Sequence, residues 1–236
     1  MVNPNLLGQA LQNLFGKLAH EVASETKFEQ RKSKLTGIKF MQVMVLGFLQ
    51  HPTASLNMLC QVAVGLGVEI SKQGLQKRLT PAAVAFMQHM FENSKDQLQN
   101  KVSLPLELLT QFTSVQLVDS SGIALPDSLV TEFPGSGGAG PAAGLKLQTI
   151  WEFVRGNLTA VVRTTGRDPD QSFTGHLAHI VRGALFLCDL GYFKLTSLAD
   201  MIAGGAYFIS RFDTQCGLLE PGMEKRFDLL AYLRQT

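Results

Sequence analysis

The 236-residue sequence has few cysteines and no long apolar run, and both absences narrow the class of protein. Its 3 cysteines, Cys60, Cys188 and Cys216, lie far apart, so neither a disulfide framework nor a zinc ribbon is expected. No apolar run reaches the ~18 residues of a membrane span. The N-terminus lacks the basic, apolar and small-residue pattern of a signal peptide. The sequence therefore predicts a cytoplasmic protein that makes no use of a membrane.

Tyrosine and tryptophan are also scarce. The 15 phenylalanines, against 3 tyrosines and 1 tryptophan, fit a buried apolar core better than an aromatic binding surface. Hydrophobic residues make up 45% and charged residues 17%, which excludes wholesale disorder. The net charge of +2 divides into about +4 over residues 1–110 and about −2 over residues 111–236. A basic front half permits nucleic-acid contact without requiring it.

Residues 1–110 read as a helical domain. Apolar residues recur at three- and four-residue steps near the N-terminus, and the same spacing returns over residues 40–49 and 55–64. Thr80 and Pro81 then begin a helix that runs to about residue 98, with proline where its missing N–H costs nothing. The polar stretch 25–34 looks like a solvated linker or a helix end.

A helix–turn–helix arrangement is expected over residues 55–79. Gly65 and Gly67 mark the turn. Ser71 then caps a short helix. This second helix is expected to expose side chains suited to phosphates and base edges, namely Lys72, Gln73, Gln76, Lys77 and Arg78. An ordinary helical hairpin with a solvated basic face is the alternative.

Residues 111–236 change to a two-residue apolar period. Residues 145–153 alternate, and a hairpin turn joins them to a β-rich run over residues 158–165. Further strands are expected at 115–118, 184–188 and 206–210, and helices at 171–181 and 195–203. Strands joined through helices imply parallel crossovers, so the second half is expected to form a mixed α/β sheet.

Two aspartates stand directly after predicted strands. Asp119 follows the first strand in V-Q-L-V-D-S-S-G, and Asp189 follows the fourth in L-F-L-C-D-L-G-Y-F. If these strands are parallel neighbours, the carboxylates come close enough to share one or two hard cations. A pair of such cations can activate an attacking oxygen and stabilise a leaving one in phosphodiester chemistry. The alternative is that each aspartate only caps the turn that follows its strand.

Three other features suggest chemistry less strongly. The glycine-rich stretch 134–144 lacks the Gly-Lys-Ser/Thr ending of a phosphate loop and precedes a strand, so it is interpreted as a flexible inter-strand loop. His176 and His179 share a helix face without a nearby acid or cysteine, so they are expected at the surface or in a groove. Cys188 is expected to face the core, away from Asp189.

Five segments in order resemble bacterial insertion-sequence transposases of the DDE type, in the insertion-sequence-four family. They cover about residues 35–215 and are I-S-K-Q-G-L-Q-K-R, V-D-S-S-G-I-A-L-P, F-P-G-S-G-G-A-G-P-A-A-G-L-K-L-Q, L-C-D-L-G-Y-F and G-A-Y-F-I-S-R. The resemblance implies a ribonuclease-H-like catalytic core, residues 111–236, behind a helical DNA-binding region, residues 1–110. It further implies metal-dependent cutting and joining of DNA ends.

The resemblance also assigns ligands and partners. Asp119 and Asp189 would be the first two catalytic acids and would ligate Mg²⁺, with Mn²⁺ as a substitute. The DNA would be the terminal inverted repeats of a transposon, bound in the bacterial nucleoid, and the protein would act as a homodimer on paired ends.

The third acid of the family is not found. It is a glutamate in the pattern Tyr-x-x-Arg-x-x-x-Glu-x-x-x-x-x-x-Lys, and Tyr232 and Arg234 have the wrong spacing. Glu220 and Glu224 follow the last predicted strand too closely. The chain is therefore expected to be the front part of a transposase with an incomplete catalytic core, weakly active or inactive alone. The alternatives are a non-catalytic DNA-binding inhibitor of transposition and a metal-dependent nuclease with a similar sheet.

Overall fold

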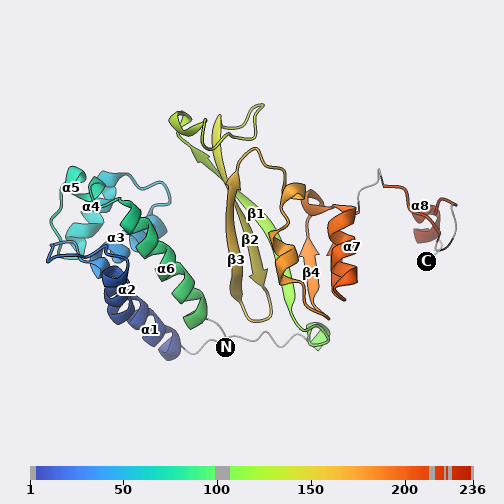
Figure 1. Ribbon diagram of the computed structural model, residues 1–236, viewed down its shortest axis with the longest axis horizontal. Coiled ribbons are helices and arrows are strands. Elements are labelled where there is room, and N and C mark those ends of the chain that lie inside the picture. The colour runs from blue at the N-terminus through green and yellow to red at the C-terminus, as the bar shows by residue number, and fades with distance from the viewer. Residues whose placement is uncertain (1–3, 99–106, 213–215, 221, 223–224, 235–236) are drawn as a thin grey trace. The chain divides into compact units, whose positions relative to one another are not determined.

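The computed structural model describes residues 4–98, 107–212, 216–220, 222 and 225–234, which fall into two compact units (Figure 1). The first unit is Met1–Val102 and is helical, and the second is Ser103–Thr236 and contains the sheet. Among the residues described, no helix combines the length and the apolar character needed to cross a membrane.

Short polar side chains set the starts of the helices in the first unit. Thr36, Ser55 and Ser71 each accept a hydrogen bond from the backbone N–H three residues later, which satisfies a donor that the helix leaves unpaired. The predicted Ser71 cap and the helix start at Pro81 are confirmed. The elements are α1 (Pro4–Asn13), a π-helical turn η1 (Leu14–Leu18), α2 (Ala19–Glu25), α3 (Gly37–Gln50), α4 (Leu56–Gly65), α5 (Lys72–Gln76) and α6 (Pro81–Leu98).

Aromatic packing holds the helical unit together. Phe28, Phe40 and Phe86 are buried, and the rings of Phe28 and Phe86 stack with centroids 5.1 Å apart. Phe28 lies within residues 25–34, so the interpretation of that stretch as a solvated linker is wrong at its centre. Gly37 allows α3 to approach α2, since a Cβ at this position would lie 2.3 Å from the Ala23 Cβ.

The second unit is built on a mixed five-stranded sheet in the order β3-β2-β1-β4-β5. β1 is antiparallel to β2, β2 is antiparallel to β3, and β4 is parallel to both β1 and β5. The strands are β1 (Val115–Leu125), β2 (Ala143–Glu152), β3 (Asn157–Thr165), β4 (Leu185–Cys188) and β5 (Tyr207–Ser210), with α7 (Leu195–Ala203) between the last two and α8 (Leu229–Leu233) near the C-terminus.

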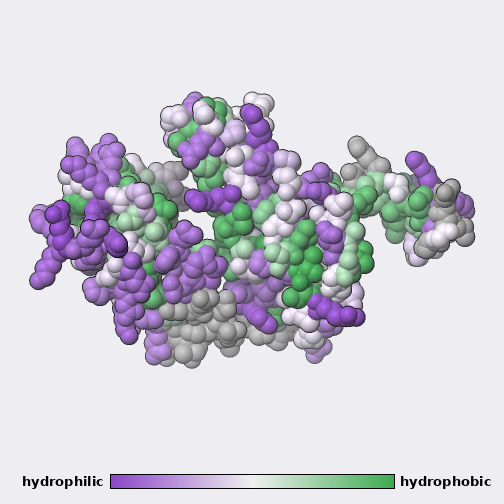
Figure 2. Space-filling view, in the orientation of Figure 1, coloured by the Kyte–Doolittle hydropathy of each residue, from purple (hydrophilic) through white to green (hydrophobic). Residues whose placement is uncertain are grey.

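Short helical segments cover one face of the sheet. Ile150 and Phe186 from the strands pack with Tyr192 and Met201 in one buried apolar cluster. These segments are α7 and the 3-10 turns η4 (Asp170–Ser172), η5 (Gly175–His179) and η6 (Leu190–Tyr192), which lie on either side of β4 along the chain. Two further 3-10 turns are η2 (Glu107–Leu109), before β1, and η3 (Asp127–Leu129), between β1 and β2. Figure 2 shows hydrophobic surface around α7, where Leu195 and Ile202 are exposed.

Two predicted elements differ from the structure. The helix expected over residues 171–181 is wrong, because the chain forms the separate turns η4 and η5 there. Ser172 donates its hydroxyl to the Pro169 carbonyl, a local bond that competes with a continuous helix. The first strand is longer than expected and runs to Leu125, because β2 pairs with it along its whole length.

The glycine-rich stretch 134–144 joins β1 to β2. It ends in strand β2 and not in a helix, and Gly137 and Gly138 take positive φ angles of 79° and 62°. Its interpretation as an inter-strand segment is confirmed, and no helix N-terminus follows it to hold a phosphate.

Candidate active site

The parallel pairing of β1 with β4 brings the two aspartates side by side. Val118 pairs with Cys188, so Asp119 and Asp189 are the next residues along two adjacent strands, which lie ~4.8 Å apart. The two carboxylates were expected to come close only if the first and fourth strands are parallel neighbours, and β1 and β4 are such neighbours. Asp119 does not end its strand, however. It lies where β1 leaves β4 and continues beside β2.

Both carboxylates are exposed and are fixed by their own backbone. Asp119 Oδ1 accepts a hydrogen bond from the Ser120 N–H at 2.8 Å, and Asp189 Oδ1 accepts one from the Leu190 N–H at 2.6 Å. Both residues line an open cleft of about 570 Å³ at this edge of the sheet. The cleft therefore presents two oriented acids to solvent, an arrangement that suits a bound cation.

Arg211 brings a positive charge to the same cleft. Cys188 pairs with Ser210, so Arg211 follows β5 just as Asp189 follows β4. One guanidinium nitrogen of Arg211 lies 3.5 Å from Asp189 Oδ1, and its side chain is 76% exposed. Arg211 was not among the site residues expected from sequence. The signal that identifies it is its place directly after a short parallel strand.

The donor set fits a hard divalent cation. Mg²⁺ is commonly held by one or two carboxylates, with water and substrate phosphates completing its coordination. Asp119 and Asp189 provide two such carboxylates. Among the described residues no third histidine, cysteine, aspartate or glutamate joins them in a cluster able to hold a metal. Glu220 instead pairs with Lys225 at 3.2 Å, and Glu224 lies outside the described residues.

Cys188 does not add a ligand at neutral pH. Burial raises the pKa of its thiol to about 11, so the thiolate that a metal would need is scarce. The side chain is half-buried and packs against the apolar cluster under the sheet. Cys188 also lines the cleft, so its expected place in the core is confirmed only in part.

His176 corrects another expectation. It was expected at the surface or in a groove, yet it is 1% exposed, and its ring packs among Phe173, Phe186 and Tyr192. The physical reason is that η5 lays this residue against the covered face of the sheet. Burial, followed by the charge of His179, lowers the pKa of His176, so the ring is neutral at neutral pH.

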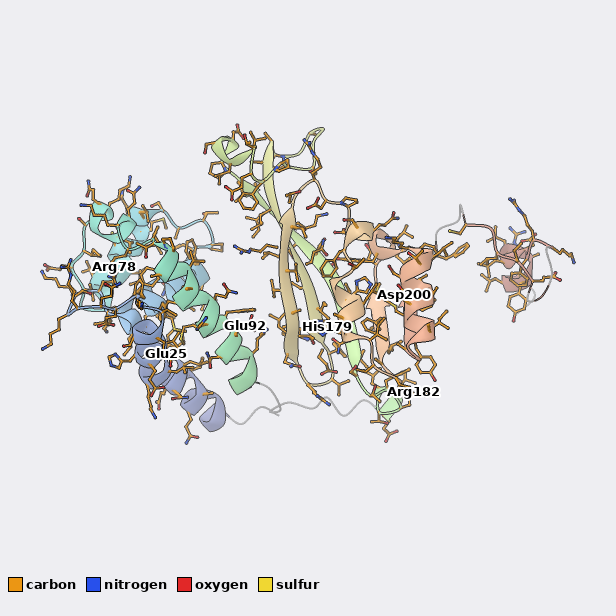
Figure 3. All side chains as sticks on the ribbon, viewed as in Figure 1. Glu25, Arg78, Glu92, His179, Arg182 and Asp200 are labelled. Atoms are coloured by element: carbon orange, nitrogen blue, oxygen red, sulfur yellow. The ribbon has the colours of Figure 1, made fainter. Side chains whose placement is uncertain are left out.

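The helical unit presents a smaller polar face than the sequence predicts. Lys72, Gln73, Gln76 and Lys77 are exposed, as expected. Arg78 is not: it follows α5 in the helical unit (Figure 3), its guanidinium carbon lies 4.1 Å from the Phe28 ring centre, and one nitrogen donates to the carbonyls of Phe28 and Leu35. The prediction that Arg78 is exposed is wrong because an apolar ring and two carbonyls hold it inside.

The mixed five-stranded sheet flanked by helices gives this chain a ribonuclease-H-like fold. Residues 110–232 match the family described as the transposase DDE domain, and the chain belongs to this family. The fold class expected from the sequence is confirmed.

Curated relatives support the same assignment. The chain is 32% identical over 206 residues to the transposase for insertion sequence element IS231E of Bacillus thuringiensis subsp. finitimus, covering 85% of this chain and 42% of the relative. It is 29% identical over 211 residues to the transposase for insertion sequence element IS1151 of Clostridium perfringens, covering 87% and 45%. The chain thus spans less than half the length of these relatives.

Proposed function

We propose that this chain binds the ends of an insertion sequence and supplies the first two acids of a metal-dependent site for DNA cleavage and strand transfer. The observation that carries the proposal is the register between β1 and β4, which sets Asp119 beside Asp189 in one open cleft. Family membership favours this use of the two acids over simple turn capping.

Each cleft residue has a proposed part. Asp119 and Asp189 would hold Mg²⁺ or Mn²⁺. When bound, such an ion supplies the positive charge that activates an attacking oxygen and stabilises a leaving one. Arg211 would contact a DNA phosphate near the cleft, because a guanidinium matches phosphate geometry and its present partner, Asp189, is also exposed.

We expect the 236-residue chain to cleave DNA only weakly by itself. Two carboxylates leave the ion with fewer protein ligands than the three acids of the family, and each 1.36 kcal/mol lost in the transition state costs about tenfold in rate. We therefore expect Mn²⁺ binding without robust DNA nicking. This separates the protein from an active nuclease with a similar sheet.

The metal site is tested by titrating the 236-residue chain with Mn²⁺ in a calorimeter. Asp119→Asn and Asp189→Asn are each expected to weaken binding at least about tenfold, because each removes a charged ligand. Asp127→Asn, an exposed aspartate in η3 outside the cleft, is the matched control and should bind as the unmodified chain does. Equal affinity in all four proteins would refute the site.

The DNA-binding face is proposed to be Lys72, Gln73, Gln76 and Lys77. The unmodified chain and Lys77→Ala are compared on a duplex bearing the terminal inverted repeat of the encoding element, over a series of salt concentrations. Loss of one phosphate contact should reduce the salt slope by about one. Preference of the chain for this duplex over a shuffled one, together with absent Mn²⁺ binding, would favour the inhibitor of transposition.

The proposed homodimer on paired ends is tested by sedimentation of the chain with the same duplex. Binding of the chain to chromosomal DNA in cells would support the proposed place at the nucleoid.

A further inference from the structure

A polar network lies behind the two aspartates, on the covered side of the sheet. The Tyr192 hydroxyl of η6 donates to Gln148 Oε1 of β2 at 2.5 Å, and Gln148 Nε2 donates to Asp170 Oδ1 of η4 at 2.9 Å. Lys146 Nζ lies 3.0 Å from the same oxygen of Asp170 and also donates to the Asp168 carbonyl at 2.8 Å. Gln148 is 1% exposed and Tyr192 is 4% exposed, so the central bond is shielded from water.

The network reaches the backbone of both acids. Gln148 pairs in register with Ser120, whose N–H holds the Asp119 carboxylate. At the other end, the Tyr192 N–H donates to the Asp189 carbonyl at 3.0 Å, closing the turn η6 that begins beside that acid. Tyr192 therefore connects Gln148, through its side chain, to the turn that follows Asp189, through its backbone.

The polar character of this cluster needs a reason beyond packing. Burying an amide and a phenol costs free energy that their mutual hydrogen bonds only offset, whereas apolar side chains of similar size would fill the space without that cost. What directional bonds add is a defined geometry, because each fixes two atoms along one line.

Close packing restricts the same turn. A Cβ added at Gly191 would lie 3.2 Å from Asp170 Oδ2, a tight contact, so η6 sits closely against Asp170. Burial would raise the pKa of Asp170, but hydrogen bonds from Gln148, Lys146 and Ser120 outweigh it and lower the pKa, so Asp170 is an anion at neutral pH. Burial raises the pKa of Tyr192, which keeps its hydroxyl a donor.

We propose that Tyr192, Gln148, Asp170 and Lys146 are positioning residues that fix Asp189 relative to Asp119. The proposal rests on the proposed metal site, and it assigns these four side chains a part in the geometry of the acids and not in contact with DNA or metal. Asp170 and Lys146 orient Gln148, Gln148 orients Tyr192, and Tyr192 fixes the turn after Asp189.

The first test is Mn²⁺ titration of the full chain carrying Tyr192→Phe, which removes only the hydroxyl. Affinity is expected to fall about tenfold, the usual size of an effect transmitted through groups that orient a metal ligand. Leu198→Val, in the same apolar cluster, is the control: it should lower the unfolding temperature yet leave affinity within about twofold. Unchanged affinity in Tyr192→Phe would overturn the proposal.

Lys146 is partly exposed, so its variants provide a second test in case Tyr192→Phe does not fold. Lys146→Met should weaken Mn²⁺ binding, and Lys146→Arg should restore it, because arginine keeps the positive charge beside Asp170. If Lys146→Met and Lys146→Arg both weaken Mn²⁺ binding, altered packing alone would explain the loss. That result would contradict the proposal that the charge of Lys146 positions Asp170 and Gln148.

Hydrogen exchange separates failure of this proposal from failure of the metal site. If the unmodified chain binds no Mn²⁺, the proposed function fails. The exchange rates of the backbone amides of residues 189–193 still measure how rigidly the turn after Asp189 is held. Their exchange should be at least about tenfold faster in Tyr192→Phe and unchanged in Leu198→Val. Equal exchange in the two variants would overturn the positioning role whatever the metal result.

Discussion

Two neighbouring cations of the helical unit, Lys77 and Arg78, differ in their surroundings. The Lys77 side chain is exposed, while the Arg78 guanidinium stacks on Phe28 and donates to two carbonyls. Sequence alone gives both the same weight, because the partners of Arg78 lie 43 and 50 residues away along the chain. The distinction is visible only when the fold brings residues 28–35 against the end of α5.

Replacing Arg78 is therefore expected to act on stability. Arg78→Met keeps much of the aliphatic stem but removes the stacked charge and leaves two carbonyls without this donor, a cost of about 1–3 kcal/mol. Urea unfolding followed by circular dichroism measures the loss. Lys77→Met is the control and should change stability by less than about 0.5 kcal/mol. Equal midpoints for the two variants would contradict the structural role of Arg78.

At the scale of elements, regular segments agree with their sequence patterns better than short ones. The alternation over residues 145–153 and the apolar run at 195–203 locate β2 and α7 closely, because one face of each is buried. Residues 171–181 have helical spacing but form the separate turns η4 and η5. A local bond from the Ser172 hydroxyl to the Pro169 carbonyl and the burial of Phe173 and His176 beneath the sheet override that spacing there.

The candidate site shows the same division. Asp119 and Asp189 could be singled out because acids after strands are readable in sequence. Their adjacency depended on strand order, which sequence supplied only as a condition. Arg211 directly follows a predicted strand, but its place beside Asp189 depended on the register between β4 and β5. The Gln148–Tyr192 bond depended on the path of η6, which no spacing rule contains.

The burial of His176 in η5 makes the sheet unit sensitive to acid. Its pKa is lowered in the folded chain, so the unfolded chain takes up the proton more readily. Stability is complete above the unfolded pKa of about 6.5 and is lost as the pH falls below it, toward the lower folded value. His176→Phe should reduce this dependence.

The unmodified chain is expected to be less stable at pH 5.5 than at pH 7.5, and the difference is expected to be smaller in His176→Phe. Urea unfolding followed by tryptophan fluorescence measures it at both pH values. His51→Phe, an exposed histidine of the helical unit, should keep the pH dependence of the unmodified chain. The same acid sensitivity in His176→Phe would assign the effect to another group.

At the scale of the whole molecule, the two units have separate cores. One apolar cluster contains Phe28, Phe40 and Phe86, and another contains Ile150, Phe186 and Met201, with no residue in common. A unit with its own buried core is the usual element of cooperative unfolding. The two units are therefore expected to unfold in two steps.

The sequence offers a probe for each step. Trp151, the single tryptophan, lies on β2, so its fluorescence reports the sheet unit, whereas circular dichroism at 222 nm is dominated by the helices of the first unit. The two signals should give different urea midpoints. Arg78→Met should lower the urea midpoint measured by circular dichroism and leave the fluorescence midpoint unchanged. The reason is that the partners of the Arg78 guanidinium, Phe28 and Leu35, both lie in the helical unit. Coincident curves that shift together in Arg78→Met would show instead that the two cores unfold as one.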